Sequence, residues 1–478
     1  MSRATAAIFD LDRTIIGSAS GRIFAHHLAE AGLTRADGSA AAIADLMFET
    51  FNRFGESGLL MRLARLAPRS AKGQAVADIA AAAAAAAPDL HDSVQPFAFQ
   101  VFDEHRSAGR KLVLATTSPR HMVEPLAEML EFDQVIATTW EVGDDGNFTG
   151  AIDGDFVWGR GKAKAVKAWA RANKIDLRES YAYSDSYYDA PLLAAVGHPI
   201  AVNPDARLAS LSFLRGWPIR HLDAPEGVVK IFGREFQELI RPLTSNEDLI
   251  PNARFEITGL HNIPAEGGAI VCANHRSYFD PTVMSLILAK AGRNARFLGK
   301  KEVFDAPIIG QMAVAAGGIR VERASGSSEP LERAAVALRA GEVVGLMPEG
   351  TIPRGPAFFN PELKGRWGAA KLAAMSGADV IPVGIWGTEK VWPRSARLPK
   401  LNLTDPPLIT VNIGKPVKLK HRSPDADTTR IMAAIMDLLP PEASEQREPT
   451  LEELALTFPP GYTGDPTAED DRRPGTDT

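Results

Sequence analysis

The sequence predicts two α/β domains joined in one chain. Short apolar runs typical of buried strands alternate with segments of helical periodicity, first over residues 1–222 and again over residues 250–440. The length of 478 residues also exceeds one ordinary domain of roughly 100–200 residues. Because strands that alternate with helices usually pair in parallel, we expect a mostly parallel, Rossmann-like sheet in the first domain and a second α/β sheet in the other.

The first domain begins with a strand at residues 4–9. An Ala-rich stretch of helical periodicity follows over residues 17–96, with eight consecutive Ala at 80–87, and predicts an inserted helical region. The further elements that we expect are a strand at 111–118, a helix from about residue 120, a hairpin at Asp145-Gly146, a helix at 163–172 and a strand at 180–186.

Two segments flank the second domain. In the linker 223–249, apolar residues recur at intervals of three and four from Val228 to Leu243, which predicts an amphipathic helix. That helix either packs on the second domain or lies in the headgroup region of a membrane. Residues 441–478 carry ten acidic residues against three Arg and are rich in Pro, so we expect a disordered acidic tail.

Composition excludes several classes of function. The formal net charge of -6 gives no basic field for nucleic acid. The single cysteine, Cys272, cannot form an internal disulfide, which favours a reducing, cytoplasmic location. Stretches without a charge, among them residues 306–319, are shorter than the roughly 18–20 residues of a bilayer span. Any membrane contact is therefore expected to be peripheral, at the cytoplasmic face.

Paired carboxylates follow two strands of the first domain. Asp10 and Asp12 come directly after the first strand, where an open α/β sheet binds its ligands. One carboxylate can attack phosphorus, while the other protonates the leaving alcohol and later activates water. Asp185 and Asp189 follow a later strand, and such oxygen ligands suit Mg²⁺.

These motifs, with Thr116 after the strand KLVLA and Lys162 in GRGK, resemble the haloacid dehalogenase superfamily, in its phosphoserine-phosphatase-like branch. The resemblance covers residues 4–222 and implies a helical cap at about 17–96. It implies a nucleophile (Asp10), a general acid/base (Asp12), phosphate binders (Thr116 and Lys162) and Mg²⁺ site residues (Asp10, Asp12, Asp185 and Asp189), with Asp12 acting as a metal ligand through its backbone carbonyl. Two alternatives stay open: Lys164 replaces Lys162, or the domain is a scaffold without activity.

A histidine and an aspartate mark the second domain. His275 and Asp280 lie in the segment NHRSYFDP between a predicted strand and a helix that begins at Pro281. A carboxylate that holds one imidazole nitrogen leaves the other free as a general base for an alcohol. No Ser or Cys nucleophile motif accompanies the pair. We therefore expect the substrate to supply the nucleophile.

Three further blocks follow in the second domain. Arg320 and Arg323 lie in GIRVER and suit a phosphate monoester. Glu349-Gly350-Thr351 follows a strand, and Pro382 lies in the apolar run VIPVG. Together with NHRSYFD, these blocks resemble the glycerolipid acyltransferase family that includes lysophosphatidic acid acyltransferases, over residues 250–420.

The second resemblance implies roles for these residues. His275 would be the base and Asp280 its orienting partner, and the donor would be an acyl-CoA or acyl carrier protein thioester. Acceptor binding is implied for Arg323, Glu349 and Gly350; Arg320 and Thr351 are neighbouring candidates, and Pro382 would line the acyl-donor site. Relatives commonly have Arg directly after the P-E-G-T block, whereas here Arg354 comes two residues later.

The combined hypothesis is a glycerolipid O-acyltransferase fused to a Mg²⁺-dependent phosphomonoesterase. The preferred acceptor is lysophosphatidate, 1-acyl-glycerol 3-phosphate, in phospholipid biosynthesis, with glycerol 3-phosphate as the alternative. One rival is an acyltransferase whose first domain is not catalytic. Another is a regulatory protein that senses phosphorylated metabolites and recruits partners through its acidic tail.

Overall fold

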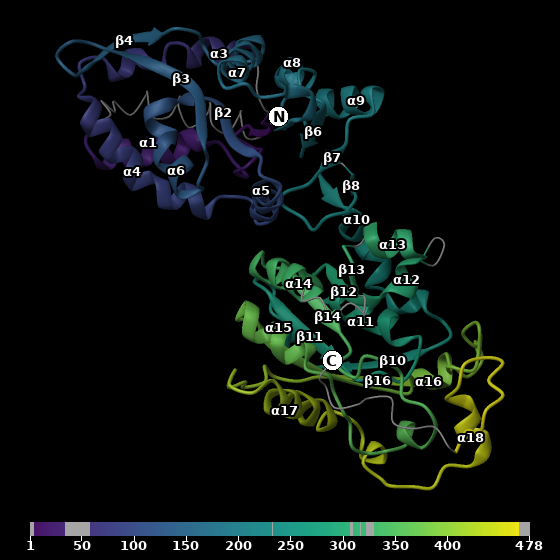
Figure 1. The fold of residues 1–478 in the computed structure, drawn as a ribbon. Coiled ribbons are helices and arrows are strands. Elements are labelled where there is room, and N and C mark those ends of the chain that lie inside the picture. Colours follow the sequence, from purple (N-terminus) through teal and green to yellow (C-terminus); the bar gives the residue numbers. More distant parts are fainter. Residues whose placement is uncertain are drawn as a thin grey trace. The chain divides into compact units, whose positions relative to one another are not determined.

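A computed structural model describes residues 4–33, 58–231, 233–305, 309–315, 317–321 and 329–467, and every structural statement below concerns these residues. The chain divides into two units, Met1–Ala224 and Pro225–Thr478. Each contains one seven-stranded sheet with helices packed against it (Figure 1). The expectation of two α/β domains with mostly parallel sheets is confirmed.

The sheet of the first unit has the strand order β4-β3-β2-β1-β5-β6-β7. All neighbouring pairs are parallel except β3 with β4. Strand β1 lies between β2 and β5, so the residues directly after it are flanked by two other strand ends. The strands are β1 (Ala6–Phe9), β2 (Lys111–Pro119), β3 (Gln134–Val142), β4 (Phe148–Asp153), β5 (Tyr181–Ser184), β6 (His198–Val202) and β7 (Ile219–Arg220).

The core of the first unit forms where small and aromatic side chains meet. The Ala-rich helix α4 (Val76–Asp92) buries four alanines and packs beside α1 (Ser20–Glu30) and α6 (Arg120–Met129), because a face without bulky side chains allows helices to approach closely. The rings of Phe9 and Tyr183 stack 4.5 Å apart. The other helices are α3 (Gly58–Ala64), η1 (Ala67–Ala71), α5 (Ala98–Ser107), α7 (Arg160–Ala172), η2 (Leu177–Glu179), η3 (Tyr187–Asp189), α8 (Ala190–Leu193) and α9 (Ala206–Arg215).

The second unit has the strand order β10-β16-β15-β11-β14-β12-β13, with only β15 and β16 antiparallel. Strand β11 lies between β14 and β15 and is buried along its whole length. Such two-sided burial explains its unbroken apolar sequence. The strands are β10 (Arg254–Thr258), β11 (Ala269–Ala273), β12 (Ala295–Lys300), β13 (Ile319–Val321), β14 (Val343–Leu346), β15 (Asp379–Trp386) and β16 (Leu408–Ile413).

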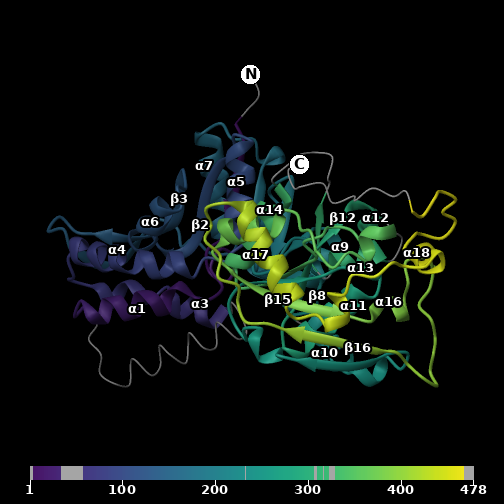
Figure 2. The same cartoon turned by 90° about the horizontal axis from the view of Figure 1, so that it is seen from below.

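Helix α15 packs against both α14 and α17 in the second unit (Figure 1), and Figure 2 shows α14 and α17 from below. Helix α11 (Asp280–Lys290) follows β11 and buries Val283, Met284 and Ile287 in the core. The remaining helices are α10 (Phe236–Thr244), η4 (Glu247–Leu249), η5 (Leu260–Asn262), α12 (Lys301–Asp305), α13 (Ile309–Ala315), α14 (Glu329–Arg339), η6 (Gly355–Phe358), α15 (Gly368–Ser376), α16 (Thr388–Val391), α17 (Pro424–Met436), η7 (Pro441–Ala443) and α18 (Leu451–Leu456).

The linker between the domains differs from the expected single helix. A short hairpin of β8 (Lys230–Ile231) and β9 (Arg234–Glu235) comes first, and helix α10 begins only at Phe236. Gly233 has a φ of 77°, a left-handed conformation that turns the hairpin and that most other residues avoid. Phe232, which belongs to the predicted apolar face, lies outside the described residues.

The described part of the C-terminal segment contains more structure than its composition predicts. Helix α18 begins with a capping box formed by Thr450 and Glu453. The ring of Phe458 is buried and stacks on Tyr462, and the Thr457 hydroxyl accepts a hydrogen bond from the Gly355 amide. Part of residues 451–458 is therefore ordered: the buried side chains of Leu454 and Phe458 and the capping box stabilise this helix despite its acidic sequence. Residues 468–478 lie outside the described part.

None of the helices in the described part is both long and apolar enough to span a bilayer.

Candidate active sites

Lys162 connects two of the predicted carboxylates in the first unit. Its ammonium donates to Asp10 Oδ1 at 2.7 Å and to Asp189 Oδ2 at 2.6 Å, and the lysine is fully buried. Helix α7 brings Lys162 there, and Gly159, with a φ of 54°, turns the chain into that helix. Because removal of Lys162 would leave two buried carboxylates without this cation, the lysine stabilises the arrangement of the site.

Thr14 brings Asp10 and Asp185 together. The Thr14 hydroxyl lies 3.4 Å from Asp10 Oδ2 and 3.4 Å from Asp185 Oδ1, and it accepts a hydrogen bond from the Asp185 amide at 3.0 Å. The second oxygen of Asp185 faces the Nε of Arg13 at 3.3 Å. Two carboxylates from β1 and β5 therefore converge on one side of the threonine.

The donor set fits a magnesium ion held by few protein ligands. No group of three or more His, Cys, Asp or Glu side chains among the described residues forms a ready-made metal cage. Mg²⁺ commonly binds one or two carboxylates and keeps several waters, and Asp10 with Asp185 supplies two carboxylates. One Asp189 oxygen is buried without a hydrogen-bond partner in the described structure, but the other is held by Lys162 and Ser184. The structure thus brings together two of the four predicted metal residues.

The Asp12 carboxylate, the predicted general acid/base, is held by two serines. Its oxygens accept hydrogen bonds from the Ser20 amide at 2.5 Å and from the Ser118 hydroxyl at 3.1 Å. Burial raises the pKa of the Asp12 carboxyl, and the hydrogen bonds from Ser20 and Ser118 and the charge of Lys162 oppose that effect. A raised pKa favours the protonated form that a general acid needs.

Thr116 lies on β2, beside this group. Its side chain is buried, and its hydroxyl accepts a hydrogen bond from the Ser118 amide at 3.1 Å. Lys164, the alternative to Lys162, is exposed and pairs with Asp155 instead. The geometry therefore favours Lys162 as the cation of the first site.

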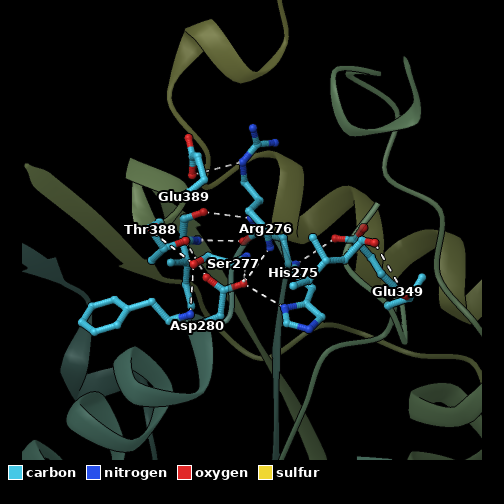
Figure 3. Close-up of polar contacts among 12 residues, drawn as sticks. His275, Arg276, Ser277, Asp280, Glu349, Thr388 and Glu389 are labelled. Carbon is cyan, nitrogen blue, oxygen red and sulfur yellow. Dashed lines mark hydrogen bonds and ion pairs between the residues drawn. The ribbon is translucent and has the colours of Figure 1, made fainter. Parts of the chain in front are cut away.

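In the second unit, His275 and Asp280 are in direct contact (Figure 3). His275 Nδ1 lies 2.8 Å from Asp280 Oδ2. Because a carboxylate oxygen accepts, Nδ1 carries the proton and Nε2 presents its lone pair. The His275 side chain is 18% exposed, whereas that of Asp280 is 1% exposed. The imidazole can thus meet a substrate while its partner stays sheltered.

Asp280 is held by four hydrogen bonds. Oδ2 accepts from His275 and from the amides of Arg276 at 2.6 Å and Ser277 at 2.8 Å. Oδ1 accepts from the Thr388 hydroxyl at 2.5 Å. The short loop from β11 to α11 folds back on Asp280, so that one side chain orients both the imidazole and the loop that carries it.

Glu349 supports the same loop from another strand end. Its Oε1 accepts a hydrogen bond from the His275 amide at 2.9 Å, and the residue is buried (Figure 3). Asn274 adds two reciprocal bonds with the Ile385 backbone, both at 2.8 Å. The structure therefore places Glu349 as a support of His275, whereas the resemblance implies acceptor binding.

Arg276 anchors the side of the loop that faces away from the imidazole. Its guanidinium lies over the rings of Phe358, at 4.1 Å, and Trp386, at 4.3 Å, and its Nε is 3.6 Å from Glu389. In Figure 3 its side chain runs away from the ring of His275. Cation–π contacts of this kind stabilise the loop without entering the reaction.

The predicted acceptor-binding residues do not converge as one group in the described structure. Arg320 on β13 pairs with Asp305 at 3.1 Å, while Arg354 is nearly buried, 5.7 Å from the ring of Phe458. Thr351 lies 3.5 Å from the Ile352 carbonyl, and Gly350 follows Glu349 with a φ of 69°. Arg323 lies outside the described residues. Pro382 is on β15, paired with Cys272 of β11.

Sequence reasoning assigned no role to several polar residues of the two sites. Thr14 completes the motif D-x-D-x-T, so its spacing from Asp10 was a usable signal. Ser118 lies two residues after Thr116 at the end of the same strand. Thr388 is 108 residues from Asp280, and only the paired ends of β11 and β15 bring them together; no local pattern indicates that contact.

Comparison with known proteins agrees with this division. Residues 7–194 match the family model of haloacid dehalogenase-like hydrolases, and residues 254–386 match that of the acyltransferases. The "Inhibition of morphological differentiation protein" of Streptomyces azureus is 38% identical over 228 residues, which are 46% of this chain and 79% of the relative. Phosphoserine phosphatase SerB1 of Mycobacterium tuberculosis is 32% identical over 217 residues, which are 45% of this chain and 70% of the relative.

Among solved structures, the chain is similar to the 1-acyl-sn-glycerophosphate acyltransferase of Thermotoga maritima, with 24% sequence identity and a TM-score of 0.33. The match covers 42% of this chain and 77% of that one. The sequence identity to the curated relatives and the share of their length that is covered, together with the family model over residues 7–194, establish the family of the first unit. The chain belongs to the haloacid dehalogenase-like hydrolases through its first unit, to which an acyltransferase domain is fused.

Proposed function

We propose that the second unit transfers a fatty acyl group from a thioester donor, acyl-CoA or acyl carrier protein, to the free hydroxyl of 1-acyl-glycerol 3-phosphate. The observation that carries this proposal is the 2.8 Å contact between His275 Nδ1 and Asp280 Oδ2. It leaves Nε2 as a base on a partly exposed side chain. The acyltransferase family match supports the reaction class.

In the proposed acyl transfer, His275 Nε2 takes the proton of the acceptor hydroxyl as its oxygen attacks the thioester carbonyl. Asp280 stabilises the imidazolium through Nδ1. The tetrahedral intermediate then expels the thiolate, which receives the proton from Nε2. Cys272 does not serve as a nucleophile, because it is buried in β11 and burial raises the pKa of its thiol.

In the first unit, we infer hydrolysis of a phosphate monoester. Asp10, whose Oδ1 is held by Lys162, attacks phosphorus, and the bond to the leaving alcohol breaks as Asp12 protonates that alcohol. The Asp12 carboxylate then takes a proton from water, which attacks the aspartyl phosphate, releases inorganic phosphate and restores Asp10. Asp10 and Asp185, with the Asp12 backbone carbonyl, would hold Mg²⁺, which supplies electrostatic stabilisation of the phosphoryl oxygens. The similarity to a named phosphoserine phosphatase supports this reaction class.

The fusion suggests that both units act on one set of molecules. We infer that the phosphatase removes phosphate from the acceptor or from the acylated product and yields a neutral glyceride. The acyl chain length and the position acylated are left open in this proposal.

Incubation of the full chain with labelled acyl-CoA tests both activities. Wild type, His275→Ala and Asp10→Asn would each receive lysophosphatidate or glycerol 3-phosphate, and the lipids would be separated by chromatography. We expect His275→Ala to lose acyl transfer alone and Asp10→Asn to lose phosphate release alone. Acyl transfer by His275→Ala at the wild-type rate contradicts the first proposal. No phosphate release by wild type from any glycerophosphate contradicts the second.

A further inference from the structure

Three leucines of the second unit are left in solvent by a single loop. Leu398, Leu401 and Leu403 are 75%, 77% and 62% exposed, and all belong to residues 396–405 between α16 and β16, here called the leucine loop. Single exposed leucines are common on protein surfaces, but three within six positions of one loop concentrate apolar side chains there. We take this concentration as the mark of a surface that is covered during function.

The backbone of the leucine loop is held by hydrogen bonds at several positions. The Lys400 amide donates to the Val391 carbonyl at 2.8 Å, and the Lys400 carbonyl accepts from the Asn252 side chain at 3.1 Å. The Trp392 indole donates to the Ala396 carbonyl at 3.0 Å. At the far end, Asn402 Oδ1 accepts from the Asp405 amide at 3.1 Å and forms a turn. The leucines are therefore presented by a braced loop.

The charge of the leucine loop is positive. Arg397 and Lys400 are exposed and alternate with the leucines, and Asp405 is the one acidic residue of the loop. No ion pair within the described residues engages either basic side chain. Exposed apolar side chains interleaved with cations match the chemistry of an anionic bilayer, whose headgroups attract Lys and Arg while its hydrocarbon accepts leucine.

The loop is connected to the proposed acyl-transfer site. The Ser277 hydroxyl donates to the Trp392 carbonyl at 2.6 Å, and the Ser277 amide donates to Asp280. The ring of Trp392 lies 5.9 Å from that of Tyr278. Trp392, which precedes the leucine loop and holds its residue Ala396, thus contacts the same segment that carries His275.

We propose that the leucine loop docks the second unit on an anionic lipid bilayer. This inference rests on the proposed acyl transfer to a lipid. Helix α10 is the rival, with Leu239 and Leu243 40% and 60% exposed, but its Arg241 donates to Asn294. The cations of the leucine loop face solvent, which favours the loop as the docking surface.

Vesicle flotation tests the proposal on the full chain. The vesicles would contain phosphatidylcholine and phosphatidylglycerol in roughly a 3:1 ratio, with pure phosphatidylcholine for comparison. We expect wild type to float with the anionic vesicles, and the triple variant Leu398→Ser, Leu401→Ser, Leu403→Ser to bind on the order of 100-fold more weakly. Equal unfolding temperatures would show that the variant is folded.

Two matched variants make the result specific. Phe213→Ser with Leu214→Ser removes side chains of the first unit that are 87% and 80% exposed, and we expect it to float like wild type. Leu239→Ser with Leu243→Ser tests α10. Flotation of the loop variant at the wild-type level, loss of flotation only in the α10 variant, or no flotation of wild type would each overturn the proposal.

Acyl-transfer assays separate docking from catalysis. The loop variant should acylate water-soluble glycerol 3-phosphate from a short-chain acyl-CoA at the wild-type rate, if that acceptor is used, and lose about tenfold or more on lysophosphatidate in vesicles. Equal rates on vesicles would count against docking through the loop. If wild type floats through the loop yet acylates nothing, the proposed function fails while the docking surface stands.

Discussion

The two units place their sites at equivalent points and fill them with different chemistry. Asp10 comes directly after β1, and His275 comes two residues after β11. Each of these strands lies between two parallel neighbours. The first site is a buried network of opposite charges around Lys162. The second is one acid that orients a partly exposed imidazole. Open α/β sheets commonly bind ligands at such strand ends, and the side chains that follow the strand determine the chemistry.

The sites also differ in how far apart their residues are in the sequence. Asp10, Lys162 and Asp185 span 175 positions and meet only in the folded sheet, whereas His275 and Asp280 belong to one short loop. The first site therefore depends on correct folding of its whole unit. In the second site the pair itself is local, and only its supports, Thr388 and Glu349, come from distant strand ends. Variants that act on one site alone test this contrast.

The largest effect is expected from Asp10→Asn. Because the amide cannot attack phosphorus, phosphate release should fall on the order of 10⁴-fold or more, while acyl transfer should stay within about twofold. Release of inorganic phosphate and transfer of labelled acyl chains would be measured on the same preparation. A parallel loss of both activities would show that the two sites are not independent.

His275→Ala is the matching change in the second unit. Loss of a general base should lower the acyl-transfer kcat by about 10²–10⁴-fold and leave phosphate release unchanged. His261→Ala, at a histidine in η5 of the same unit, serves as the control. A normal rate in His275→Ala would remove the proposed base.

Thr388→Val tests the support of Asp280. The methyl group replaces a hydroxyl that donates to a buried carboxylate, and such a loss costs about 1–3 kcal/mol. We expect a roughly tenfold lower acyl-transfer kcat, with KM for the acceptor little changed. Thr258→Val, at a threonine of the same unit whose hydroxyl donates to Asn412 instead, is the control; equal effects of both variants would contradict the positioning role.

Acid should destabilise the first unit through His105. Burial and the charges of Arg110 and Arg220 lower the pKa of His105 to about 4, and its Nε2 lies 2.8 Å from the Tyr183 hydroxyl. Between pH 6.5 and 4 the unfolded chain therefore binds a proton that the folded chain does not, so stability falls as the pH falls. From pH 7 to pH 5 this amounts to about 2 kcal/mol. His105→Gln should remove that part of the difference in urea unfolding, and an unchanged pH dependence would exclude His105 as its source.

The smallest effect concerns Arg13, which faces the Asp185 oxygen on the side away from Thr14. Its positive charge competes with Mg²⁺ for that carboxylate. We therefore expect Arg13→Gln to bind Mg²⁺ about threefold more tightly in calorimetry, while Arg13→Lys should stay near wild type. Equal or weaker affinity in Arg13→Gln would show that the guanidinium does not compete.

Much of the fold could be predicted from the sequence because its signals are local. The alternation of apolar runs and helical periodicity predicted two α/β units, and the contact of His275 with Asp280 follows from their spacing in one loop. The support of Asp280 by Thr388, and that of His275 by Glu349, could not be predicted, because sheet pairing joins segments 74 to 108 residues apart. The ordered segment around Phe458 was also not predicted. Its acidic, Pro-rich composition is typical of disorder, and the few apolar residues that anchor it form no recognisable pattern in the sequence.

Strand β16 has a practical consequence for anyone who wishes to express the acyltransferase part alone. The matched family region ends at residue 386, yet β16 pairs with both β10 and β15 and so joins the outer strand to the rest of the sheet. A fragment cut at that boundary would lose the strand that links β10 to β15 in the described sheet and would leave an unpaired strand edge prone to aggregation. Gene fragments should therefore extend beyond Phe458, which also retains the contact of Thr457 with Gly355.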